Sequence, residues 1–277
     1  LIIFFQICFI ALILLISGFL LKKKLFKEAS INNFAENGIL GFILIGFISL
    51  LVNFVFPLNF FINNFLILSI LLLGYKFNFF LVNKIKLLRN IFFVSFISYI
   101  FVIYSNVNTP DAFLYHLPYS KILNDSKIVV GLSNLHFRFG HISIIQYTSA
   151  ISNNFIFREN GIVFPSALIA SSVIINFLSN ANRNFKKDKF NFHFFIINFF
   201  LMFIFYKANR YGEYGNDTPA HLLMFLLISE IIKNINKVNS EKFFNLVLIS
   251  IFIIMNKIIL LLSIFYPLVF FFSNKLK

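Results

Sequence analysis

The sequence predicts an all-α protein: a polytopic bundle of about eight or nine transmembrane helices with a long amphipathic loop on its outer side. Of the 277 residues, 59% are hydrophobic and only 12% are charged, and the mean hydropathy is +0.87. A soluble domain carries about 25% charged residues. A water-soluble globule of this size could not hide so much apolar surface. The apolar runs are continuous rather than alternating, which favours helices over barrel strands.

Nine apolar runs are candidates to cross about 30 Å of hydrocarbon, which takes roughly 20 helical residues. The first run is not a signal peptide, because basic residues follow it rather than precede it. The last two runs are short, and one broken helix is the alternative. We expect a single transmembrane domain over residues 1–277; the start at Leu1 rather than Met leaves open a fragment of a longer chain. The runs cover 1–21, 39–57, 60–75, 91–105, 161–179, 190–206, 219–233, 243–256 and 258–273.

Basic residues predict the sidedness of the bundle. Five clusters next to the predicted spans hold 17 of the 24 Lys and Arg residues, and all five fall on the same side. The positive-inside rule makes that side cytoplasmic. The net charge of +14 therefore reflects topology, and we expect no nucleic-acid partner. The clusters lie at 22–27, 76–89, 183–189, 233–242 and 275–277.

The opposite side carries a loop over 106–160, a connection over 207–218 and a tight turn at Lys257. The first of these is about 55 residues long, whereas most connections have about 4–6 residues. Long ordered loops often carry function. Apolar stretches within this loop predict that it lies along the membrane surface.

The loop opens on a segment that contains Asp111, Tyr115 and His116. Pro110 suits the first turn of a helix, where its missing N–H would be unpaired anyway, and Asp111 then lies where the helix dipole favours a carboxylate. Asp111, Tyr115 and Tyr119 follow an i, i+4, i+8 pattern and are expected to share one helix face. The alternative for Asp111 is a residue that only compensates the dipole.

A second segment is dense in groups that bind anions or position hydroxyls. It contains Asn134, His136 and Arg138 between Gly131 and Gly140. An arginine can hold a phosphate through two parallel hydrogen bonds. The alternative is a surface turn whose polar groups satisfy its own backbone.

A third segment brings Asp217 to the mouth of a predicted span, just before Pro219. His221 follows one helical turn deeper on the same face, and ionisable groups at membrane depth are functional candidates. The alternative for Asp217 is a plain helix cap. Two complete predicted spans separate Asp111 from Asp217, so both carboxylates fall on the outer side.

Two outer carboxylates with His and Arg nearby suit general-base chemistry on a hydroxyl and recognition of a phosphate or pyrophosphate. The chain lacks phosphate-loop, dinucleotide and zinc motifs, and we expect no cofactor. A divalent cation held by Asp111, His116, His136 and His141 is an open alternative, although the spacing fits no ligand pattern. Few charges fall within the spans, and paired broken helices are missing, which disfavours a transporter.

These segments resemble multi-spanning glycosyltransferases of the GT-C type, which carry an acidic residue in a large outer loop just after a span. The residues that carry the resemblance are Asp111 with Tyr115-His116-Leu117, then the run from Gly131 to Gly140, then Asp217 with Pro219. The same signature is similar to that of an uncharacterised bacterial family of multi-spanning proteins. It covers 105–150 well and 209–225 loosely.

The resemblance implies a transfer of a sugar from a polyprenyl-phosphate donor to an acceptor on the periplasmic face of a bacterial inner membrane. It makes Asp111 the catalytic base, and it implies membrane lipid and a lipid-linked sugar as partners. The alternatives are a transporter or flippase for a lipid-linked substrate and a polysaccharide-assembly protein. The candidate substrate-binding residues are Tyr115, His116, Asn134, His136, Arg138, Asp217 and His221.

Overall fold

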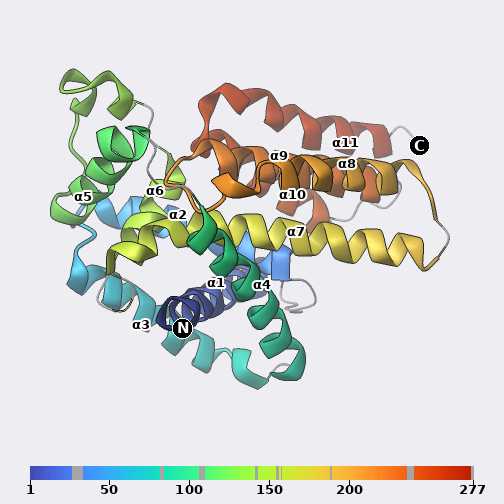
Figure 1. Ribbon diagram of the computed structural model, residues 1–277, viewed down its shortest axis with the longest axis horizontal. Coiled ribbons are helices and arrows are strands. Elements are labelled where there is room, and N and C mark those ends of the chain that lie inside the picture. The colour runs from blue at the N-terminus through green and yellow to red at the C-terminus, as the bar shows by residue number, and fades with distance from the viewer. Residues whose placement is uncertain are drawn as a thin grey trace.

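The computed structural model describes residues 1–26, 34–81, 84–105, 110–140, 143–153, 156, 158–187, 189–235 and 240–275. Within these ranges the chain forms eleven α-helices joined by short 3-10 turns and one π-turn, without a strand (Figure 1). The helices are α1 (Ile2–Phe26), α2 (Phe34–Asn53), α3 (Phe60–Lys76), α4 (Lys84–Tyr104), α5 (Leu117–Asp125), α6 (Ile144–Ser152), α7 (Phe164–Phe185), α8 (Phe192–Tyr206), α9 (Asp217–Asn234), α10 (Ser240–Asn256) and α11 (Phe265–Lys275).

The all-helical prediction is confirmed, and each of the nine apolar runs coincides with a helix. Four helical stretches are long and apolar enough to cross a membrane: Ile2–Phe26, Ala35–Asn53, Lys84–Tyr104 and Gly161–Phe185. The other runs form shorter helices. With its 15 residues, α8 rises only about 22 Å, less than the hydrocarbon thickness of about 30 Å.

The last two apolar runs are separate segments rather than one broken helix. The chain leaves α10 at Asn256, reverses at Lys257, and continues through a 3-10 helix over Ile258–Ile264 into α11. Figure 1 shows α11 returning alongside α9 and α10 toward the opposite end of the bundle. The tight turn predicted at Lys257 is therefore present.

The core is built around α7, which crosses the middle of the molecule between α8–α11 on one side and α1, α3 and α4 on the other, with α2 behind it (Figure 1). Its residues from Ala167 to Ala170 are fully buried. Aromatic stacking joins it to the neighbouring helices, because the Phe177 ring stacks on Phe200 at 6.0 Å and Phe200 stacks on Phe225 at 4.4 Å. One continuous hydrophobic cluster runs from α1 to α11.

Helices α1 and α2 approach each other at two glycines. A Cβ atom added to Gly18 would lie 1.8 Å from the backbone oxygen of Asn37, and one added to Gly41 would lie 2.0 Å from that of Leu14. Small residues allow this backbone contact, which is a common way for helices to pack in lipid.

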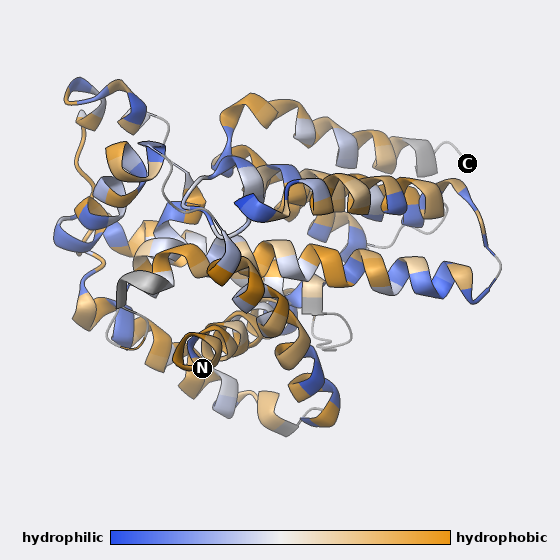
Figure 2. Cartoon of the chain, viewed as in Figure 1, coloured by the Kyte–Doolittle hydropathy of each residue, from blue (hydrophilic) through white to orange (hydrophobic). Residues whose placement is uncertain are grey.

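Hydrophilic residues gather at the two ends of the bundle, and apolar residues cover the helices between them (Figure 2). One end carries α5, α6 and the start of α9. The other carries the ends of α7 and α9 and the start of α10, where the basic residues Lys186, Lys233 and Lys242 lie. The helices thus separate two polar regions.

We predict that Gly18→Ala and Gly41→Ala each lower the stability of the protein by about 2 kcal/mol or more, because the added methyl group meets backbone that cannot move aside. The measurement is thermal unfolding in detergent. Gly140→Ala is the control, because its nearest neighbour would lie at an ordinary 3.7 Å. Equal unfolding midpoints for all three variants would contradict the packing described.

Candidate functional site

A cavity of about 810 Å³ lies at the end of the bundle that carries α5 and α6. This volume falls within the range of ligand sites, roughly 300–1,000 Å³. Its walls come from the ends of α2 and α10, the start of α9, α6, and the two loop segments around residues 111 and 138. The lining residues are Leu50, Asp111, Tyr115, Phe137, Arg138, Gly140, Ile144, Tyr147, Asn216, Asp217, Ile254, Met255, Asn256, Lys257, Ile258 and Ile259.

A π-turn sets the direction of the first side chains. The backbone is π-helical from Ala112 to His116, and the N–H of Leu117 donates to the carbonyl of Ala112. Pro118 has no N–H to donate to the preceding turn, which permits this change of register. Asp111 and Tyr115 line the cavity, whereas Tyr119 turns into the core, where it is 3% exposed. The prediction that Tyr119 shares a face with Asp111 and Tyr115 is therefore wrong.

Asp111 forms an ion pair with Arg138, whose Nη1 donates to Asp111 Oδ1. The 3-10 turn Phe137–Gly140 presents the arginine, and its backbone N–H donates to His136 Nδ1 at 3.3 Å. The guanidinium also lies over the Tyr115 ring, 5.1 Å from its centre. Arg138 is thus held by two kinds of contact, one ionic and one with an aromatic face.

Asp217 forms the second ion pair, with Lys257 Nζ 2.7 Å from Asp217 Oδ1. The N-cap position of α9 is occupied by Asn216, and Asp217 follows it in the first turn, so Asp217 is not the cap residue. Asn256 fixes the turn before Lys257, because its Oδ1 accepts from Ser143 Oγ at 2.9 Å and from the Ile145 N–H at 3.1 Å. The cavity therefore contains two cations and two carboxylates in pairs.

His116 lies directly behind Tyr115 and is only 5% exposed. Gln146 Oε1 accepts from the Ser143 N–H, so its Nε2 donates to His116 Nδ1 at 3.2 Å. This places the ring proton on Nε2. Burial lowers the pKa of His116 from 6.5 to about 4, although Asp111 and Asp217 act in the opposite direction. The imidazole is therefore neutral at pH 7.

Three tyrosines lie close to the charged groups, and two of them, Tyr115 and Tyr147, line the cavity. Burial and the charge of Asp111 raise the pKa of Tyr115. Burial also raises the pKa values of Tyr119 and Tyr147, whose hydroxyl oxygens lie 3.4 Å apart. All three hydroxyls keep their protons at neutral pH and can donate hydrogen bonds.

The structure brings four of the eight sequence-predicted residues together around one cavity: Asp111, Tyr115, Arg138 and Asp217. His116 supports them from behind. The other three predicted residues do not line the cavity. Asn134 is exposed on its turn, His136 contacts the Arg138 backbone and the Phe137 ring, and His221 is exposed on α9.

Sequence reasoning missed Lys257, Asn256, Asn216 and Tyr147 as cavity residues. Lys257 could have been recognised from the sequence, because it is a single basic residue between two apolar runs, on the side opposite the five basic clusters. Tyr147 could not have been recognised, because it lies on α6, within the predicted loop 106–160, and the sequence does not determine the path of this segment.

Comparison with known proteins gives one match. The sequence matches the family described as a domain of unknown function, DUF8201, over residues 1–277. The chain belongs to the DUF8201 family. No curated protein and no solved structure matches it.

The metal alternative finds no geometric support in the described part of the DUF8201 chain. No group of three or more His, Cys, Asp or Glu side chains there is arranged to hold a metal ion. His141, one of the proposed ligands, lies outside the described residues.

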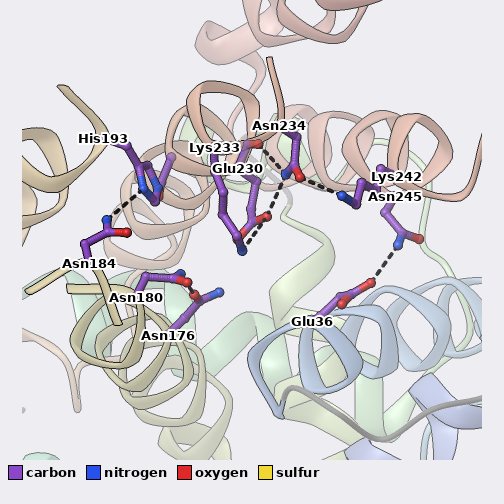
Figure 3. Close-up of polar contacts among 11 residues, drawn as sticks. Glu36, Asn176, Asn180, Asn184, His193, Glu230, Lys233, Asn234, Lys242 and Asn245 are labelled. Atoms are coloured by element: carbon purple, nitrogen blue, oxygen red, sulfur yellow. Dashed lines mark hydrogen bonds and ion pairs between the residues drawn. The ribbon is translucent and has the colours of Figure 1, made fainter. Parts of the chain in front are cut away.

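A second polar cluster of the DUF8201 chain lies at the opposite end of the bundle (Figure 3). Lys233 pairs with Glu230 at 2.9 Å, and Lys242 donates to Asn234 at 2.8 Å. Lys22 has a side chain only 5% exposed and contacts Glu36 at 2.7 Å and Glu241 at 3.2 Å. These groups satisfy one another and tie α1, α2, α9 and α10 together, which is a structural role.

We predict that His116 makes the DUF8201 protein less stable in acid. His116 has a pKa of 6.5 in the unfolded chain and a pKa of about 4 in the folded protein. Because the unfolded chain binds this proton first, up to about 3 kcal/mol of the free energy of unfolding is lost as the pH falls from 6.5 to about 4. The measurement compares unfolding in detergent at pH 7 and pH 4.5. His116→Gln, which keeps an acceptor for Gln146, should lose less stability. An identical loss in both proteins would contradict the burial of a neutral imidazole.

Proposed function

We propose that this protein is a GT-C-like glycosyltransferase of the bacterial inner membrane, which moves a sugar from a polyprenyl-phosphate donor to an acceptor hydroxyl on the periplasmic face. The observation that carries this proposal is the convergence of Asp111, Arg138, Asp217 and Lys257 around one cavity at a single end of an apolar bundle. A carboxylate base and phosphate-binding cations are the groups that such a transfer needs.

The proposed membrane arrangement has eight or nine spans in multi-pass topology. Four helical stretches have the length of a span by themselves. Large apolar side chains such as Phe65, Phe92, Phe199 and Met202 are exposed on the outside of the bundle, which suits contact with lipid. The shorter helices would cross where the bilayer thins around them.

The proposed reaction uses Asp111 as the base. The acceptor hydroxyl oxygen attacks the anomeric carbon of the donor sugar, and its proton passes to the Asp111 carboxylate. The bond between that carbon and the phosphate oxygen breaks, and the phosphate keeps the electron pair. Arg138 stabilises the charge on the leaving phosphate. Attack opposite the leaving group inverts the configuration of the sugar carbon.

A transporter or flippase would need a polar path through the bundle. Between the cavity and the cluster of Figure 3, α9 and α10 carry buried apolar residues. These include Leu223, Leu227, Phe252 and Ile253, all fully buried. This layer favours chemistry at one face over passage across the membrane. A polysaccharide-assembly protein would also use a large outer loop, and only the activity assay separates it from a transferase.

The test is sugar transfer by the purified protein in proteoliposomes that contain undecaprenyl-phosphate-linked hexoses or pentoses. We predict that Asp111→Asn lowers transfer at least a hundredfold while the protein still inserts and folds, because the amide cannot accept the proton. Asp125→Asn is the matched control. Asp125 is an exposed carboxylate at the end of α5, outside the cavity lining, and its variant should keep full activity.

Full activity of Asp111→Asn would reject the assignment of the base. A wild-type protein that releases no undecaprenyl phosphate from any of these donors would reject the transferase itself.

A further inference from the structure

Both cations of the cavity are already occupied by carboxylates of the same cavity. Arg138 pairs with Asp111, and Lys257 pairs with Asp217. None of the four side chains is deeply buried: the exposed fraction is 34% for Arg138, 51% for Asp111, 31% for Lys257 and 61% for Asp217. Ion pairs that water can reach are weak, so a stronger anion can replace either carboxylate.

Contacts other than the ion pairs hold the Arg138 guanidinium and the backbone that carries Lys257. The Arg138 guanidinium is supported by the faces of Tyr115 at 5.1 Å and Phe137 at 5.7 Å. The backbone of Lys257 donates to the Ile253 carbonyl at 2.9 Å, and Asn256 before it is bonded to the start of α6. An anion that displaces the two carboxylates can therefore accept hydrogen bonds from Arg138 and Lys257.

The location of the positive charge of Lys257 also favours a role in ligand binding over a role in setting the membrane orientation. The basic clusters that set the sidedness lie at the other side, and Lys257 faces the cavity beside three apolar residues of its own segment, Ile254, Ile258 and Ile259. A cation in these surroundings attracts an anion whose remainder is apolar. A phosphate attached to a lipid chain has this composition.

We propose that Arg138 and Lys257 form a two-cation clamp for the phosphate of a lipid phosphate, and that this phosphate displaces Asp111 and Asp217 from them. This inference rests on the proposed function and adds Lys257 to the site. The consequence is an ordered mechanism: Asp111 is tied to Arg138 while the cavity is empty, and donor binding frees its carboxylate to act as a base.

The test is the binding of undecaprenyl phosphate to the purified protein in detergent micelles, with undecaprenol as the uncharged probe. Removing a competing carboxylate should tighten binding, so Asp111→Asn and Asp217→Asn should each lower the Kd about threefold to fivefold. Removing a cation should weaken binding, so Arg138→Gln and Lys257→Gln should each raise the Kd about tenfold or more. Asp125→Asn should leave the Kd unchanged, and undecaprenol should bind all variants alike.

Weaker or unchanged binding by Asp111→Asn and Asp217→Asn would overturn the displacement, because the carboxylates would then hold the cations in place instead of competing for them. Unchanged binding by Lys257→Gln would remove Lys257 from the clamp. Inorganic phosphate at millimolar concentration should compete only weakly; strong competition would overturn the lipid phosphate in favour of a free anion. These binding results are independent of sugar transfer, so the clamp can stand while the transferase proposal fails.

Discussion

The cost of placing a charged group in an apolar interior governs where this chain can carry chemistry. An unpaired charge moved from water into such an interior is strongly unfavourable, and mostly apolar side chains cover the helices between the two ends of the bundle (Figure 2). The charged side chains therefore gather at those ends. At one end Lys22, Glu36 and Glu241 satisfy one another. At the other, the ion pairs of Arg138 and Lys257 face a cavity large enough for a ligand.

Rigid packing holds the cavity in shape, although two of its walls are loops. The buried first two-thirds of α7 and the close contact of α1 with α2 fix the frame. Asn256 then joins α10 to the start of α6, and Gln146 joins α6 to His116. The centre of the His116 ring lies 4.0 Å from the centre of the Tyr115 ring. Because His116 is neutral and its tautomer is fixed, it supports Tyr115 without adding charge to the site. The four charged side chains of the cavity are all at least 31% exposed, so a ligand in the cavity can reach each of them.

Much of this arrangement could be predicted from the sequence. Apolar runs are sufficient to predict helices, and counting the runs between Asp111 and Asp217 is sufficient to place both at the same end. The direction of side chains within the loop could not be predicted, because it depends on the π-turn before Pro118. The same limit applies to Asn134 and His221, whose spacing fitted the site but whose side chains are exposed elsewhere. Lys257 was placed at the correct turn, but its partner became evident only when α9 and α10 were seen together.

We propose that the cavity end of the bundle faces the non-cytoplasmic side of the membrane. Cys8 is the single cysteine, so Cys8→Ser provides a background for single-cysteine labelling with a membrane-impermeant maleimide in intact cells. Val130 is 93% exposed on the cavity side, and Lys187 is exposed at the other end. We predict that Val130→Cys is labelled from outside and that Lys187→Cys is labelled only after the membrane is opened. The reverse pattern would place the cavity on the cytoplasmic side and contradict this orientation.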